Sequence, residues 1–175
     1  MRNYDTEALS MIAEMSNCNQ DLFNGDFEKF QAIAAKFSKI DKDCFLDKST
    51  VIIQLIRLLD DNSEQDFNMM WVCSQVFEFV FKKKIDIKVF TISFFQGVEK
   101  ITQSPLWLGE LIGSFINNPI LTEHFNIVCE SVPKLSKSHT DIIVDIFDET
   151  LTGYKDDGLL DKFNRLMALK EALLA

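Results

Sequence analysis

The chain has 175 residues, and 27 acidic side chains against 18 lysines and arginines give it a net charge of −9. This length predicts a single domain, residues 1–175. The excess of carboxylates argues against direct binding to nucleic acid or to an anionic membrane, because phosphate contacts need lysine and arginine. Six glycines and three prolines leave few residues for the tight turns of a β-sandwich or barrel, which favours helices.

The first residues carry acids and a helical pattern instead of a basic end followed by an apolar core, so no signal peptide is recognised. No apolar stretch reaches the roughly 18 residues that span a membrane. The four cysteines form no CxxC pair, and the two histidines have no neighbour at metal-ligand spacing. We therefore expect a cytoplasmic protein with reduced thiols, no metal and no other cofactor.

Apolar residues recur at helical spacing along most of the chain. Helices are predicted near residues 5–16, 25–38, 49–60, 66–82, 87–102, 105–117, 119–133, 138–152 and 158–173. Ser49 or Thr50, Ser104 and Ser138 are the expected N-caps. The second of these helices has a single apolar stripe, which fits an outer position, whereas the fifth has apolar residues on two sides and is expected in the middle of the fold.

Successive helix pairs begin 32 to 39 residues apart, a step typical of two-helix repeats. The fold is therefore predicted to be all-α. We expect an irregular HEAT-like α-solenoid of about eight or nine helices, with a compact helical bundle as the alternative.

Catalytic and metal-binding patterns are absent from the sequence. Residues 41–52 begin like the calcium loop of an EF-hand, but Leu46 and Ile52 occupy the positions of the turn glycine and the bidentate glutamate. That loop is expected to be solvated. There is no phosphate-binding, nucleophile-elbow or zinc-peptidase motif, and His124 is expected at the edge of the core. An enzyme is not indicated.

Acidic residues form a row in the predicted helix near residues 138–152. Asp141, Asp145, Asp148 and Glu149 fall at i, i+4, i+7 and i+8, so they share one face, and no lysine or arginine lies between them. Such a row would attract a basic partner and speed its encounter. An ordinary solvated helix face has the same pattern, so both interpretations remain open.

Trp71 lies on the polar side of its predicted helix, with Gln75 and Glu78. Tryptophan is enriched among the residues that dominate protein interfaces. The alternative is that a neighbouring helix covers it, and Trp107 poses the same choice. The candidate partner-binding residues are thus Asp141, Asp145, Asp148, Glu149, Trp71 and Glu78, and no catalytic residue is predicted.

The stretch SPLWLGELIGSFINNPIL, residues 104–121, combines a WLxEL helix, a short FINNP turn and the start of another amphipathic helix. It resembles the helical immunity proteins of bacterial polymorphic-toxin and contact-dependent growth inhibition systems. The resemblance implies a non-enzymatic cytoplasmic protein that binds a cognate toxin domain, often a nuclease with a basic cleft, in a one-to-one complex. It carries over no contact residues, and Trp107 and Glu110, which match its pattern, are interpreted first as fold residues.

An acidic immunity protein could occlude the basic cleft of such a nuclease. From the residues alone, the alternative is a non-enzymatic helical-repeat scaffold or adaptor that binds a peptide or a regulatory protein along a concave face. A helical enzyme or ligand-binding regulator is a third interpretation.

Overall fold

The computed structural model describes residues 4–18, 26–60, 66–101 and 105–175, and all regular structure in these ranges is helical. The helices are α1 (Tyr4–Cys18), α2 (Asp26–Phe37), α3 (Lys48–Arg57), α4 (Asp66–Phe81), α5 (Ile87–Val98), α6 (Pro105–Ile116), α7 (Pro119–Glu123), α8 (Phe125–Ser131), α9 (Lys137–Asp156) and α10 (Leu160–Leu174). Two 3-10 turns, η2 (Lys42–Cys44) and η3 (Leu58–Asp60), flank α3. The prediction of an all-α fold is confirmed.

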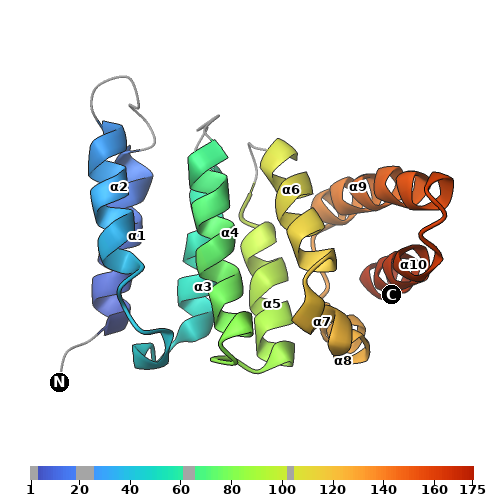
Figure 1. The fold of residues 1–175 in the computed structure, drawn as a ribbon, viewed down its shortest axis with the longest axis horizontal. Helices are drawn as coiled ribbons and strands as arrows, with labels where there is room; N and C mark the ends of the chain where they lie inside the picture. Colours follow the sequence, from blue (N-terminus) through green and yellow to red (C-terminus); the bar gives the residue numbers. More distant parts are fainter. Residues whose placement is uncertain (1–3, 19–25, 61–65, 102–104) are drawn as a thin grey trace.

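The helices stack in two layers along the long axis of the molecule (Figure 1). Contacts join α1, α3, α5, α8 and α10 in that order, and join α4, α6 and α9 in the second layer. Helix α2 extends the second layer, because Phe30 and Phe37 pack edge-on against Trp71 of α4. The arrangement is a stack of helix pairs, with α1 and α2 at one end and α9 and α10 at the other.

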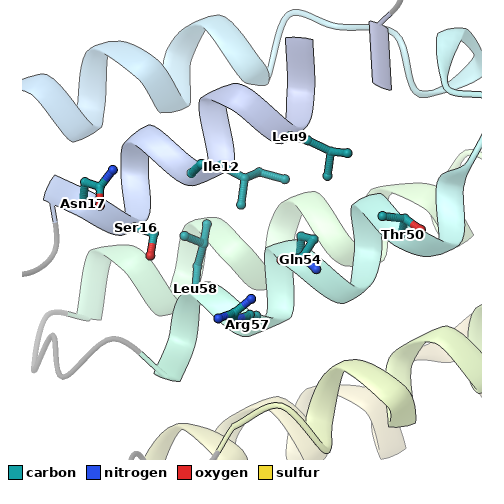
Figure 2. A pocket seen from close by; sticks show the side chains of 9 residues that line it. Leu9, Ile12, Ser16, Asn17, Thr50, Gln54, Arg57 and Leu58 are labelled. Carbon is teal, nitrogen blue, oxygen red and sulfur yellow. The ribbon is translucent and has the colours of Figure 1, made fainter. Parts of the chain in front are cut away.

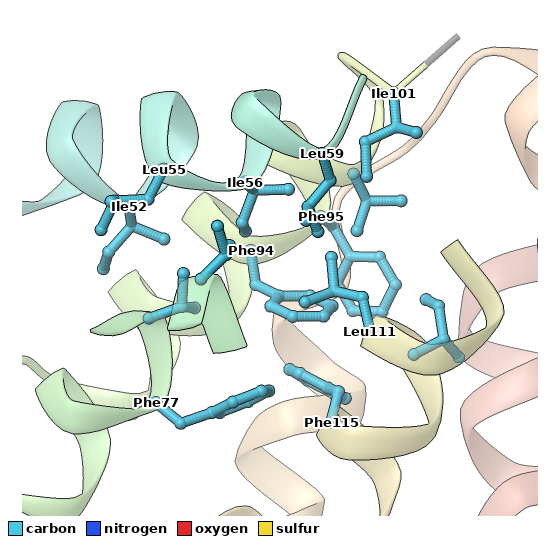
Figure 3. Packing of buried hydrophobic residues seen from close by; sticks show 14 of the residues in the cluster. Ile52, Leu55, Ile56, Leu59, Phe77, Phe94, Phe95, Ile101, Leu111 and Phe115 are labelled. Carbon is cyan, nitrogen blue, oxygen red and sulfur yellow. The ribbon is translucent and has the colours of Figure 1, made fainter. Parts of the chain in front are cut away.

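Helix α5 occupies the middle of the stack, as its two-sided apolar pattern predicted. Phe90, Phe94, Phe95 and Val98 are all buried. Phe94 packs against Phe115 of α6 with ring centroids 4.3 Å apart, and Figure 3 shows Phe94 and Phe95 between α3 and α6. The outer position predicted for the helix near residues 25–38 also agrees with the place of α2 at one end of the stack.

Glycine at position 97 allows α5 to approach α3 closely. A Cβ atom there would lie 2.8 Å from Cδ1 and 2.9 Å from Cβ of Ile56, which is closer than carbon atoms pack. The two helices make the most extensive helix–helix contact in the described structure. This approach packs α3 directly against α5.

Two sequence predictions about residues 119–133 are wrong. The helix expected over residues 119–133 is broken at His124, whose φ of −110° and ψ of 29° are not helical, and His124 is exposed instead of at the core edge. The break separates α7 from α8, which packs on α5 and α10. It also brings the helix count to ten in the described residues, one more than predicted.

The predicted N-caps are also displaced. Asp47 caps α3, accepting hydrogen bonds from the Thr50 amide (3.0 Å) and the Thr50 hydroxyl (2.6 Å). Helix α9 starts at Lys137 instead of after Ser138. Ser104 lies outside the described residues. Asp47 directly precedes the first residue of α3, whereas Ser49 and Thr50 lie inside the helix, so Asp47 takes the cap.

Candidate functional site

The outer face of α9 carries the row of acidic residues that the sequence predicted. Burial of Ile143, Phe147 and Leu151 orients the helix, since these residues form one stripe toward the core. The opposite side carries the four predicted carboxylates, and all of them are exposed: Asp141, Asp145, Asp148 and Glu149. At a rise of 1.5 Å per residue, this row is about 12 Å long. We call these four residues the α9 acidic row.

The segment around the α9 acidic row carries a large part of the net negative charge of the chain. Residues 137–157 hold six carboxylates and two lysines, a net charge of −4 out of −9 for the whole chain. In the described structure one member of the row, Asp148, forms an ion pair, with Lys170 of α10. Ile142, which is 39% exposed, lies beside the row. The surface therefore offers exposed carboxylates next to a small apolar contact.

Trp71 lies elsewhere, between α4 and α2. Its indole N–H donates a hydrogen bond to Ser38 Oγ at 3.1 Å, and its ring packs edge-on against Phe37 with centroids 5.6 Å apart. The side chain is half-buried. The neighbouring helix thus covers much of Trp71, which is the second of the two placements that the sequence left open.

Glu78, on the same helix, forms ion pairs within the molecule. It pairs with Lys82, the residue that follows α4, and, at 3.3 Å, with Lys42. The Glu78 side chain is 19% exposed. The α4 residues and the α9 acidic row are separated by α6 in the stack (Figure 1), so the structure does not bring the six predicted residues into one site.

Lys42 is a buried cation that the sequence placed in a solvated loop. Its side chain is fully buried, and Nζ donates to Gln75 Oε1 at 3.0 Å and to the Ile40 carbonyl at 3.4 Å. The ring of Phe37 lies 4.8 Å from Nζ. Burial lowers the pKa of Lys42, and the charge of Glu78 opposes this shift. Because each polar contact is internal, we assign this cluster a structural role.

A groove between α1 and α3 was missed by the sequence analysis (Figure 2). It has a volume of about 420 Å³. Its lining residues come from both helices and from the first residue of η3: Leu9, Ile12, Ala13, Ser16, Asn17, Thr50, Gln54, Arg57 and Leu58. Small side chains at positions 13 and 16 were the available signal, since they leave space that larger residues would fill. Arg57 supplies a cation at the rim.

The segment that resembles immunity proteins forms α6 and the start of α7. Trp107 is half-buried and Glu110 is exposed, while Leu108, Leu111 and Phe115 are buried. Comparisons with protein-family models, with curated proteins and with solved structures find no match to this chain.

The described residues contain no group of three or more His, Cys, Asp or Glu side chains placed to hold a metal ion. Asp41 and Asp43, from the calcium-like stretch, instead pair with Lys84. No disulfide joins the four cysteines, all of which lie in the described ranges. Burial raises the pKa of both Cys73 and Cys129 to about 11, so these thiols are poor nucleophiles at neutral pH. None of the helices described is long and apolar enough to cross a bilayer.

Proposed function

We propose that this protein is a non-enzymatic immunity protein that binds a basic toxin domain, a nuclease in the first instance, through the outer face of α9. The observation that carries the proposal is the α9 acidic row, four exposed carboxylates on one rigid helix. The resemblance of residues 104–121 to helical immunity proteins supplies the class of partner. The absence of catalytic motifs from the sequence agrees with a binding role.

The proposed mechanism is electrostatic occlusion. A nuclease cleft is lined by lysine and arginine that neutralise phosphates. Carboxylates spaced over about 12 Å of a helix can meet several of these cations at once, and opposite charge accelerates the encounter. Because the carboxylates belong to one packed helix, little backbone freedom is lost on binding. The complex would exclude nucleic acid from the cleft.

A second candidate function is favoured by the groove between α1 and α3. Its apolar floor and the cation of Arg57 suit a peptide that carries apolar residues and a carboxylate. A scaffold of this kind would use the opposite end of the stack from α9. Charge reversal on α9 would then leave partner binding intact, whereas Arg57→Glu would weaken it.

The test is charge reversal at Asp145 and Glu149. These residues lie one helical turn apart, and both are preferable to Asp148, whose replacement would also break the ion pair with Lys170. The variant Asp145→Lys, Glu149→Lys should slow association with the toxin domain that the proposal expects to be encoded directly upstream, and should weaken the affinity by at least tenfold, because like charges then face each other. Isothermal titration and stopped-flow association at two salt concentrations measure both effects.

The matched control is Glu14→Lys, Glu28→Lys. These two glutamates are exposed on α1 and α2 at the far end of the stack, and the change in net charge is the same. The control should retain affinity. Equal losses in both variants would show that net charge alone matters, and no loss in the α9 variant would refute the α9 mechanism.

A further inference from the structure

Helix α10 carries two apolar stripes, and the stack buries one of them. Leu166, Leu169 and Leu173 form the buried stripe, on the side where α10 packs against α8 and α9. A second stripe lies roughly a third of a turn further around the helix. We call it the α10 outer stripe, and it consists of Leu160, Phe163, Met167 and Leu174.

Much of the α10 outer stripe faces solvent at one end of the stack (Figure 1). Leu160 is 68% exposed and Leu174 is 58% exposed, while Phe163 and Met167 are partly buried. Leu159, the N-cap of α10, makes no side-chain capping bond and is 38% exposed, although a serine or aspartate would stabilise the helix start there. The last helix of a stack normally has a polar outer face, so this stripe indicates a contact with another molecule.

The spacing of the α10 outer stripe is that of a coiled-coil seam. Leu160, Met167 and Leu174 are seven residues apart, and Phe163 follows Leu160 by three, which are the a and d positions of a heptad. The next d position is Lys170, whose side chain pairs with Asp148 of α9. The pattern is symmetric about Met167. A second α10 that runs antiparallel would therefore place its Leu174 opposite Leu160.

The charges around the stripe are balanced, which suits a second copy of this acidic chain. Side chains of residues 154–175 sum to a net charge of zero, against −9 for the whole chain. The four cations are Lys155, Lys162, Arg165 and Lys170, and the four anions are Asp156, Asp157, Asp161 and Glu171. Two copies can approach here without the repulsion that the rest of the surface imposes.

The residues that flank the seam favour the antiparallel orientation. Asn164 and Glu171 are exposed at e positions of the heptad, where facing helices contact each other. In an antiparallel pair Asn164 of one copy faces Glu171 of the other, and an amide can donate to a carboxylate. A parallel pair would instead bring the two Glu171 carboxylates together.

A hollow beside Leu160 has room for a leucine of the second copy. It lies at the corner between α9 and α10, has a volume of about 260 Å³, and is lined by Tyr154, Lys155, Gly158, Leu160 and Phe163. Sites for drug-sized ligands have volumes of about 300–1,000 Å³, so this hollow suits a single side chain. Its place beside Leu160 is where the antiparallel pairing puts Leu174 of the second copy.

We propose that α10 binds α10 of a second copy of this chain in an antiparallel pair, with Met167 at the two-fold axis and each Leu174 in the corner hollow of the other copy. The same residues serve on both sides, as a two-fold interface requires. One 15-residue helix is about 22 Å long and buries less than the roughly 800 Å² per partner of a standard interface. The dimer is therefore weak and depends on concentration. It does not use the α9 acidic row, so it is independent of the proposed function.

Sedimentation velocity of the full chain, over about a hundredfold range of protein concentration, tests this pairing. The average mass should rise from that of a monomer toward that of a dimer. Leu160→Asp should weaken self-association by about tenfold or more, because it places a carboxylate against an apolar side chain. Leu46→Asp is the matched control, since Leu46 is 82% exposed in the loop before α3 and lies outside the seam. Circular dichroism should show that both variants remain folded.

A mixture of two variants tests the orientation of the helices. Leu160→Asp and Leu174→Lys should each weaken self-association alone, whereas their equimolar mixture should form dimers again. In the antiparallel pair the new aspartate of one copy faces the new lysine of the other, and the second end keeps its two leucines. A monomer at every concentration, self-association that Leu160→Asp does not change, or no recovery in the mixture would overturn the inference.

Discussion

Lys42 is a buried lysine whose counter-ion, Glu78, is partly buried. Lys42 is held by Gln75, by the Ile40 carbonyl and by Glu78, whose carboxylate also pairs with Lys82. Removing one partner of a buried ion pair costs more than the pair itself contributes, because an uncompensated charge is left in a medium of low polarity. The cost of substitution is therefore expected to differ between the two partners.

Glu78→Gln should lower the free energy of unfolding by about 2 kcal/mol at neutral pH, because it leaves the charge of Lys42 without its counter-ion. Lys42→Met should cost less, since methionine fills the site without a charge and Glu78 keeps Lys82. Urea denaturation of the two variants measures the difference. A larger loss for Lys42→Met would contradict a structural role based on charge compensation.

The same pair makes stability depend on pH. Burial tends to raise the pKa of Glu78, but the hydrogen bond from Lys82 and the charge of Lys42 outweigh it, so this pKa lies below its usual 4.5. A carboxylate with a lowered folded-state pKa adds stability above its unfolded-state value, and that stability is lost as pH falls through the folded value. The melting temperature should accordingly fall below about pH 4.5, and Glu78→Gln should reduce this dependence, whereas Glu123→Gln, exposed on α7, should not.

The sequence could not predict these contacts. Lysine is among the residues least often buried, and the flanking Asp41 and Asp43 indicated a solvated loop. Trp71 was ambiguous for a related reason: its helical position faced polar residues, but the covering rings of Phe30 and Phe37 come from a helix more than thirty residues away. Side-chain partners distant in sequence decide both cases.

At the scale of the helices, periodicity predicted most elements within a few residues, because apolar stripes reflect a buried face directly. The break at His124 was invisible, since Phe125 and Val128 continue the apolar pattern across it. The exposed side of α9 was predicted correctly, but the ion pair between Asp148 and Lys170 depends on how α10 folds back. Local pattern therefore identified the faces, and tertiary packing determined which charges are compensated.

Gly97 should be the least replaceable glycine in a helix. A methyl group there would overlap Ile56, and overpacking typically costs about 1–3 kcal/mol. The helix propensity of alanine returns about 1 kcal/mol. The difference is about 0–2 kcal/mol, so Gly97→Ala should destabilise the fold by about 1 kcal/mol in urea denaturation, and Ile56→Val should partly rescue it.

Gly109→Ala on α6 is the control for this prediction. A Cβ there meets no heavy atom of a neighbouring helix within 4 Å in the described part of the chain, so the substitution should stabilise by about 0.5–1 kcal/mol. Destabilisation by both substitutions, or by neither, would show that the close approach of α3 and α5 does not limit position 97.

At the scale of the whole molecule, a stack of helix pairs is held by contacts between neighbours. In the 175-residue chain the α1–α2 pair has neighbouring helices on one side, whereas α4 has neighbouring helices on both sides. Pairs with fewer neighbours open at lower free energy. The cysteines are placed to report this difference, since Cys18 is buried in α1 and Cys73 lies in α4.

Thiol labelling in increasing, sub-denaturing urea should give a lower opening free energy for Cys18 than for Cys73. Cys44 is exposed and should react at once in the native protein, which calibrates the chemistry. Mass spectrometry after proteolytic digestion assigns each labelling rate to its cysteine. Identical opening energies at Cys18 and Cys73, equal to the global free energy of unfolding, would indicate one cooperative unit instead of a graded stack.

The two sides of α9 can change independently in evolution. The stripe of Ile143, Phe147 and Leu151 holds the helix on the stack, and none of these residues reaches the outer side that carries Asp141 and Asp145. A lineage can therefore substitute the outer residues and acquire a new binding preference while the inner stripe, and with it the fold, is inherited unchanged. Related chains should then share the inner stripe and diverge on the outside.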